Sequence, residues 1–310
     1  YILPEALLGL QIQRTTQPDE MVFIMYHQIN ELLFKMILWE IDQVSNAEKV
    51  EAAFFTEKLR RVSRYFDMLS SSFAIMGAGM ELEQYMKFRN TLTPASGFQS
   101  WQFKELEAKL GLKYAHRHGQ EYYTSQLRPE QVELIRKAES EQSILQLLNA
   151  WLERMPFLEE EAADFWPLYT AAYKSSLSPE EQSAAGAFDQ IFSEDSDERT
   201  LSPRACRAAL FIMLHRGYPL LHLPFRLLNV LLEIDSQLSL WRYRHMNMVQ
   251  RMIGRRIGTG GSTGAHYLKA AADSHYVFKE FADLTSFLIQ RNKLPALPSN
   301  LASVLGYSVK

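Results

Sequence analysis

Apolar residues recur every three or four positions along almost the whole chain, the spacing that places them on one side of an α-helix. The longest such stretch, residues 20–44, is apolar around most of its circumference, so we expect a buried helix there. Asp19 and Glu20 suit its N-terminal end, because the helix dipole stabilises carboxylates at that end. Further helices are predicted at about 51–75, 101–110, 129–154, 157–176, 203–216 and 224–254, with one or two more within 266–291.

The segments between these helices predict loops. Pro94 and Gly97 mark residues 85–100 as a loop, and residues 113–123 have the same character. Residues 176–202 are small, polar and acidic, which indicates a mobile surface segment. No Asn-Gly or Asp-Gly pair joins two alternating apolar runs, as it would in a β-hairpin. We therefore predict an all-α fold: a single domain over residues 1–310, with a small helical excursion around residues 130–202.

The composition narrows the possible partners. Of the 310 residues 47% are apolar, enough for a sizeable core, and 33 basic residues against 36 acidic ones give a net charge of −3. Nucleic-acid surfaces normally carry a basic excess, and no run of about 18 apolar residues suggests a membrane span. We therefore expect neither nucleic acid nor membrane as a partner. Cys206 is the only cysteine, which excludes an intrachain disulfide and a cysteine-based zinc or iron–sulfur site, and favours a cytoplasmic location.

A glycine-rich segment, GTGGSTG, occupies residues 258–264 after a predicted helix. It is not a P-loop, because no Gly-Lys-Ser/Thr sequence stands at the required offset. Nor is it a dinucleotide fingerprint, because a helix and not a strand precedes it. One interpretation is a turn that ends the helix. The other is a loop whose glycines and hydroxyl groups approach a ligand closely, and both stay open here.

Two histidines lie inside predicted helices. His27 follows Phe23 by four residues, so the two side chains share a helix face. His245 lies in the helix predicted at 224–254. Each histidine is either a core residue bonded to a backbone carbonyl, or one of a pair in which one ligates a haem iron and the other faces it across a pocket. A CxxCH attachment motif is absent, so any haem would be bound non-covalently.

Arginines are candidate anion-binding residues. Arg89 precedes the loop at Pro94 and Gly97, and it either grips a carboxylate through two parallel hydrogen bonds or forms an ordinary surface ion pair. A basic cluster near His245 either solvates a helix end or pairs with an anionic group such as a haem propionate. The cluster consists of Arg242, Arg244, Arg251, Arg255 and Arg256.

Taken together, these features resemble the tryptophan 2,3-dioxygenase family, over nearly the whole chain. Five segments carry the resemblance, in the family's order and spacing: 19–42 (DEMVFIMYHQINELLFKMILWEID), 88–111 (FRNTLTPASGFQSWQFKELEAKLG), 147–156 (LLNAWLERMP), 223–254 (LPFRLLNVLLEIDSQLSLWRYRHMNMVQRMIG) and 258–264 (GTGGSTG). The combination of SGFQS with WRYRHM fourteen residues ahead of the loop threonine is specific. The resemblance implies a helical bundle that encloses a b-type haem.

For the haem side of the site, the resemblance implies roles position by position. His245 is expected to be the axial ligand of the haem iron, with Trp241 one turn before it. His27 is expected to be the catalytic histidine that faces the indole N–H on the opposite side. Phe23 and Tyr85 are expected to pack on the indole ring of the substrate.

The resemblance also implies contacts to the rest of the substrate. Arg89 is expected to bind the substrate carboxylate, and Thr259 the ammonium group. Ser96 and Gly97 are expected to line the oxygen-binding side of the haem. Tyr1 resembles a residue of an N-terminal arm that enters the site of a neighbouring subunit, so we expect the native N-terminus to lie upstream.

The implied reaction inserts both atoms of O2 across the indole C2–C3 bond of L-tryptophan and gives N-formyl-L-kynurenine, the first step of tryptophan catabolism by the kynurenine pathway. Ferrous haem b is the implied cofactor and O2 the co-substrate. The implied assembly is a homotetramer, a dimer of dimers with exchanged N-terminal arms. A haem monooxygenase acting on a modified tryptophan, and a non-catalytic haem sensor or haem-free helical interaction module, are the alternatives.

Overall fold

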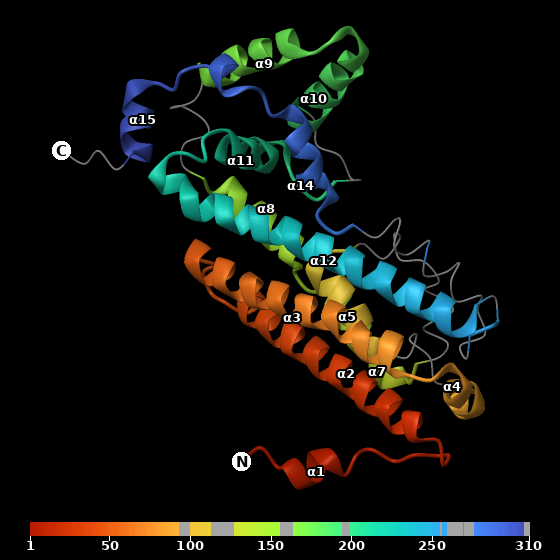
Figure 1. Ribbon diagram of the computed structural model, residues 1–310. Coiled ribbons are helices and arrows are strands. Elements are labelled where there is room, and N and C mark those ends of the chain that lie inside the picture. The colour runs from red at the N-terminus through yellow and green to blue at the C-terminus, as the bar shows by residue number, and fades with distance from the viewer. Residues whose placement is uncertain are drawn as a thin grey trace. The chain divides into compact units, whose positions relative to one another are not determined.

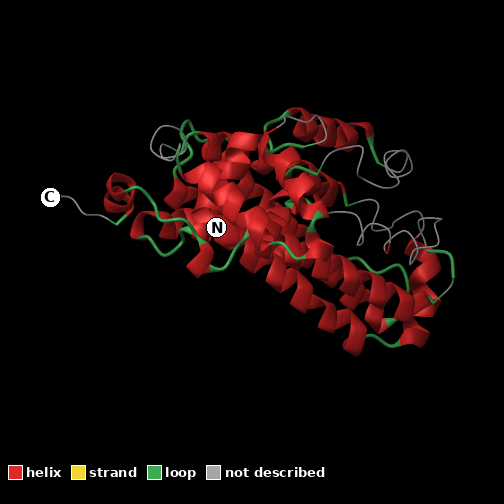
Figure 2. Ribbon diagram, turned by 90° about the horizontal axis from the view of Figure 1, so that it is seen from above, coloured by secondary structure: helices red, strands yellow, loops and turns green. Residues whose placement is uncertain are grey.

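The computed structural model describes residues 1–92, 100–112, 127–155, 164–193, 199–254, 256–258, 269 and 276–306. In this part of the chain all regular secondary structure is helical and no strand occurs (Figure 2). The predicted all-α fold class is therefore confirmed. Among these residues no helix is long and apolar enough to cross a membrane.

The helices lie mostly where the apolar periodicity predicts them. In chain order the α-helices are α1 (Pro4–Leu8), α2 (Pro18–Ser45), α3 (Ala52–Gly79), α4 (Leu82–Phe88), α5 (Trp101–Leu110), α7 (Pro129–Ser140), α8 (Ile144–Glu153), α9 (Phe165–Ser176), α10 (Ser183–Ser193), α11 (Pro203–Leu214), α12 (His222–Ile253), α14 (Lys279–Asp283) and α15 (Ser299–Leu305). Short 3₁₀ helices are η1 (Arg89–Leu92), η4 (Pro179–Glu181), η5 (Pro219–Leu221), η6 (Leu284–Phe287) and η7 (Arg291–Lys293).

The chain divides into two compact units. The first comprises residues 1–43, 60–143 and 234–277, and the second comprises residues 44–59, 144–233 and 278–310. Three of the long helices, α2, α3 and α12, have residues in both units. The single catalytic domain over the whole chain stays a prediction.

In the first unit α2 and α3 lie side by side and run in opposite directions (Figure 1). The Ser72 hydroxyl of α3 donates to Asn30 Oδ1 of α2 at 3.2 Å, and Arg61 bonds Glu40 at 3.2 Å. The partner on α3 moves from 72 back to 61 as α2 advances from 30 to 40, which defines the antiparallel pairing.

The C-terminal half of α12 runs parallel to α3 in the same unit. Ser63 Oγ donates to Gln237 Oε1 at 3.1 Å, and Arg244 Nη1 donates to the Ser70 carbonyl at 2.7 Å. Both residue numbers rise together along these contacts. The first half of α2 lies beside the end of α3, and the end of α3 lies beside the C-terminal part of α12. The same stretch of α3 therefore packs against both helices.

Buried ion pairs hold α5 against α12. Glu107 is 1% exposed and bonds both Arg242 Nη2, at 2.8 Å, and Lys104 Nζ, at 3.1 Å. Beside them Phe103 packs on Trp241, with ring centroids 4.8 Å apart. These contacts fix α12 at the turn that begins with Trp241.

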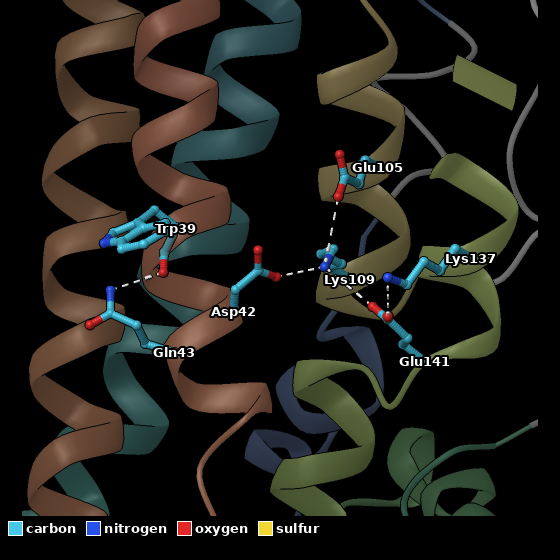
Figure 3. Close-up of polar contacts among 7 residues, drawn as sticks. All are labelled: Trp39, Asp42, Gln43, Glu105, Lys109, Lys137 and Glu141. Carbon is cyan, nitrogen blue, oxygen red and sulfur yellow. Dashed lines mark hydrogen bonds and ion pairs between the residues drawn. The ribbon is translucent and has the colours of Figure 1, made fainter. Parts of the chain in front are cut away.

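A second polar group, around Lys109, joins α5 to α2 and α7 (Figure 3). Lys109 Nζ lies 2.5 Å from Asp42, 3.3 Å from Glu141 and 3.7 Å from Glu105. Burial opposes the charge of Lys109, but the hydrogen bond to Asp42 and the nearby carboxylates outweigh it and raise the pKa of Lys109. One ammonium thus links three helices.

The prediction that α2 is buried around its circumference is wrong. Its core face is buried, but Met25, Ile29, Leu32, Met36 and Trp39 are exposed. Apolar periodicity indicates that a helix face is covered by protein. It does not show whether the protein that covers it belongs to the same chain or to another one.

Two predicted loops are partly helical. Within 85–100, α4 continues to Phe88 and η1 to Leu92, while residues 93–99 lie outside the described part. Within the predicted mobile segment 176–202, η4 and α10 form, and Phe188 and Phe192 of α10 are buried. Two aromatic residues four positions apart supply an apolar helix face that the acidic composition conceals. The loop predicted at 113–123 lies outside the described residues.

Candidate active site

His27 lies on α2 against the ring of Phe23, one turn earlier, with ring centroids 4.1 Å apart. Its Nδ1 lies 2.8 Å from the Phe23 carbonyl oxygen. A carbonyl oxygen only accepts hydrogen bonds, so Nδ1 carries the proton and donates it. In the neutral ring Nε2 is then an acceptor, held in a fixed direction by the backbone of its own helix.

The surroundings of His27 keep its ring neutral while leaving it accessible. Burial lowers the pKa of His27, and the hydrogen bond to the Phe23 carbonyl only partly opposes that effect. The residue is nevertheless exposed to solvent. Its exposure leaves the ring within reach of a ligand.

His245 is the second histidine of the site, on the C-terminal half of α12. Phe73 of α3 stacks on its ring at 6.0 Å with an interplanar angle of 21°, and Trp241 lies 5.4 Å away. Burial, and after it the charge of His27, lower the pKa of His245 to about 4. Since the pKa of each ring lies below its ordinary value, both imidazoles are neutral at pH 7.

Aromatic rings connect the two histidines across three helices. Tyr26 meets the edge of His27 at 5.1 Å and lies 6.2 Å from Phe73, which in turn stacks on His245. Sequence reasoning missed Tyr26 and Phe73, because in a helix an apolar or aromatic residue at core spacing carries no separate signal of a binding role. The run places flat aromatic rings beside both histidines.

Arg89 stands at the end of α4, on the side of the site where Phe23 lies 6.1 Å from Tyr85. Its guanidinium is buried, and Nη2 donates to the Ile257 carbonyl at 2.7 Å. Its Nε is buried without a hydrogen-bond partner, and no carboxylate of the described residues forms an ion pair with it. A buried cation in this state suits an anionic ligand.

Of the remaining predicted site residues, Trp241 lies beside His245, and the described structure does not place the others at this group. Ser96, Gly97 and Thr259 lie outside the described residues. Tyr1 is fully exposed at the chain end. Trp241 is buried, and among the described residues its Nε1 has no hydrogen-bond partner.

Two arginines of the cluster near His245 bond to neighbouring helices. Arg242 is buried and bonds Glu107, and Arg244 bonds the Ser70 carbonyl. Both side chains tie α12 to its neighbouring helices. Arg255 lies outside the described residues.

Comparison with known proteins finds the same family repeatedly. The family model described as tryptophan 2,3-dioxygenase matches residues 5–196 and 181–288. A tryptophan 2,3-dioxygenase of Alteromonas mediterranea is 37% identical, over 99% of this chain and 96% of the relative. One of Bdellovibrio bacteriovorus is 34% identical, over 99% of this chain and 97% of the relative. One of Rattus norvegicus is 36% identical, over 96% and 83%.

Proposed function

The chain belongs to the tryptophan 2,3-dioxygenase family, and from that premise we propose that it oxidises L-tryptophan to N-formyl-L-kynurenine with both atoms of O2, at a haem b held by His245. The observation that carries the proposal is the pair of histidines on α2 and α12, which the rings of Tyr26 and Phe73 connect within the first unit. One serves the iron and the other the substrate.

The residues present fit a haem. His245 has no hydrogen-bond partner among the described residues, and a neutral imidazole nitrogen is the usual axial ligand of non-covalent haem. Phe73 and Trp241 offer flat apolar surfaces beside it. Among the described residues no group of three His, Cys, Asp or Glu side chains could hold a metal ion, whereas a haem needs only one protein ligand. Ferrous haem b supplies the activation of O2.

The protein's own task is to bind and orient tryptophan. Arg89 fixes the carboxylate, since its buried guanidinium retains donors that no described carboxylate uses. Phe23 and Tyr85 hold the indole ring between apolar surfaces. His27 Nε2 accepts the indole N–H, because its Nδ1 proton is committed to the Phe23 carbonyl. The resemblance adds Thr259 for the ammonium group and Ser96 and Gly97 for the oxygen side.

The assembly forms the second part of the proposal. We propose a homotetramer with exchanged N-terminal arms in which Tyr1 reaches a neighbouring subunit. The exposed apolar residues of the N-terminal segment support it, because α1 buries no residue within its own chain. The single buried cysteine suits a reducing, cytoplasmic setting.

Isotope labelling tests the reaction. Protein reconstituted with haem and reduced, then supplied with tryptophan and ¹⁸O2, should yield N-formyl-kynurenine that contains two labelled oxygen atoms. One labelled atom would identify a monooxygenase, and haem binding without product would identify a sensor. Either result rejects the proposal.

Haem content tests the ligand independently of turnover. His245→Ala should lose most of the Soret absorbance, because the axial bond is removed. His215→Ala is the matched control: His215 is also buried with a pKa lowered to about 4, but it lies in the second unit. Full haem content in His245→Ala would exclude His245 as the ligand.

A further inference from the structure

α2 carries a continuous stripe of exposed apolar side chains. Met25, Ile29, Leu32, Met36 and Trp39 follow one another at intervals of four, three, four and three residues and are 40–69% exposed. This is the heptad spacing of side chains that meet another helix in a coiled coil. Figure 3 shows Trp39 and Asp42 leaving α2 on different sides, so the stripe is separate from the Lys109 ion pairs.

α3 extends this apolar surface. Met68 and Ile75 are 55% and 42% exposed. They follow Arg61 along α3 at intervals of seven residues. Residues seven apart lie on the same side of a helix, and Arg61 bonds Glu40 of α2 at 3.2 Å. Met68 and Ile75 therefore border α2. We call these two residues and the five of the stripe the α2–α3 face.

The size of this face sets it apart from ordinary surface. At roughly 200 Å² for a fully exposed large side chain, the observed exposures amount to roughly 700 Å² of apolar surface. The largest apolar patch on a typical monomer is about 300–600 Å². A stable dimer contact covers roughly 800 Å² on each partner, polar rim included. The α2–α3 face is thus the right size for the centre of such a contact.

We propose that the α2–α3 face joins two copies of this chain, with α2 packed antiparallel on α2 of the partner subunit. The proposal rests on the homo-oligomeric assembly proposed above and states which surface forms it. A two-fold contact needs a surface that is complementary to itself. An apolar stripe in heptad spacing meets that condition, since pairing two such stripes buries apolar area without burying a charge.

The heptad pattern also gives the register. In an antiparallel helix pair, the first core position of a heptad on one helix faces the second core position on the other. Ile29 then meets the partner's Leu32, and Met25 meets the partner's Met36. The register one heptad further along would place Met25 against the partner's Gln43. Apolar matching therefore selects the pairing of Ile29 with Leu32.

A charge-rescue experiment tests this contact. Ile29→Lys and Leu32→Glu are made separately, and the molar mass of each haem-reconstituted protein is measured by sedimentation equilibrium. Each variant alone should show half the wild-type mass, because two lysines or two glutamates enter the apolar contact. An equimolar mixture should recover the wild-type mass, because one copy's lysine then faces the other copy's glutamate while Leu32 still faces Ile29.

Matched controls separate interface loss from misfolding. Leu134→Lys and Leu134→Glu alter an exposed leucine of α7 and should keep the wild-type mass. Helical circular dichroism should be the same in all variants. If either charged variant misfolds, the Ile29→Ala, Leu32→Ala double variant replaces it, and the subunit dissociation constant should rise at least about tenfold.

Each remaining outcome decides the question. Wild-type mass in both charged variants would overturn the proposal. Halved mass without recovery in the mixture would also overturn it and would point to another occupant, such as the partner's N-terminal segment. The mass measurement does not depend on turnover. The interface proposal can therefore be rejected while labelled product still forms, and it can be supported while no product forms.

Discussion

At the scale of single residues, the tautomer of His27 determines its chemistry. Nδ1 donates to the Phe23 carbonyl at 2.8 Å, which leaves Nε2 as an acceptor. Burial lowers the pKa of His27 and keeps this neutral form in place at pH 7. The ring is therefore suited to accept the indole N–H and has no proton of its own to give at that atom.

A methylated ligand separates hydrogen bonding from packing at His27. His27→Ala should weaken tryptophan binding about tenfold, the net value of roughly one hydrogen bond of 1–1.5 kcal/mol. Binding of 1-methyltryptophan, which lacks the N–H, should change much less. Titration of the haem absorption measures both affinities. Equal weakening of the two ligands would show that His27 contributes packing alone.

Arg89 is the residue on which carboxylate recognition depends. Arg89→Met should weaken tryptophan binding by about 2–4 kcal/mol, because a charge-assisted contact in a buried place is lost. Haem content should not change. Tryptamine, which has no carboxylate, should bind the variant and the wild type alike in the same titration.

Arg14 is the matched control for Arg89. It is exposed, and like Arg89 it donates to a backbone carbonyl, that of Thr91, at 2.6 Å. Arg14→Met should leave tryptophan affinity within about twofold of wild type, since exposed contacts contribute little. If the two variants behave alike, Arg89 has no special role in the substrate site.

At the scale of helices, the ion pairs between α5 and α12 support the turn before His245. Glu107→Ala should lower the free energy of unfolding by about 3–5 kcal/mol, because one carboxylate serves two buried cations, Arg242 and Lys104. Urea unfolding measures the loss. Glu105→Ala is the control on the same helix, where a 3.7 Å pair with Lys109 should be worth about 1 kcal/mol or less. A small loss in both variants would mean that packing of Phe103 on Trp241 is sufficient.

The elements that sequence could predict are those with a strong apolar period. α2, α3, α11 and α12 all appear close to their predicted bounds, because their apolar positions alone define a helix face. α10 was missed since its two buried aromatic residues stand in an acidic, small-residue context. α4 was missed, since no helix was predicted between residues 75 and 101, and Pro94 and Gly97 marked residues 85–100 as a loop.

At the scale of the whole molecule, periodicity does not reveal which helices meet. It placed His27 and Phe23 on one face, but the row of rings from His27 through Tyr26 and Phe73 to His245 depends on α3 packing against both α2 and α12. Apolar periodicity does not encode which distant helices pack together, and only the family resemblance predicted that these two histidines share a site. The exposure of the α2 stripe is likewise a property of the folded chain, since it depends on what the other helices leave uncovered.

Buried histidines also set how the stability of the molecule depends on pH. Burial lowers the pKa of His215 from 6.5 to about 4, so between these values the unfolded chain binds one proton more than the folded chain. The free energy of unfolding therefore falls as pH drops from about 6.5 to about 4, by roughly 3 kcal/mol for this one group, and its contribution is fully present above pH 6.5. Urea unfolding of haem-free protein at pH 7 and at pH 4.5 measures this effect. From the higher to the lower pH, the free energy of unfolding of His215→Gln should fall by about 2 kcal/mol less than that of the wild type. His222→Gln, which alters an exposed histidine, should follow the wild type. Equal losses in all three proteins would mean that His215 gains its proton without unfolding, and that the packing of Phe165 and Phe211 around it does not exclude the charge.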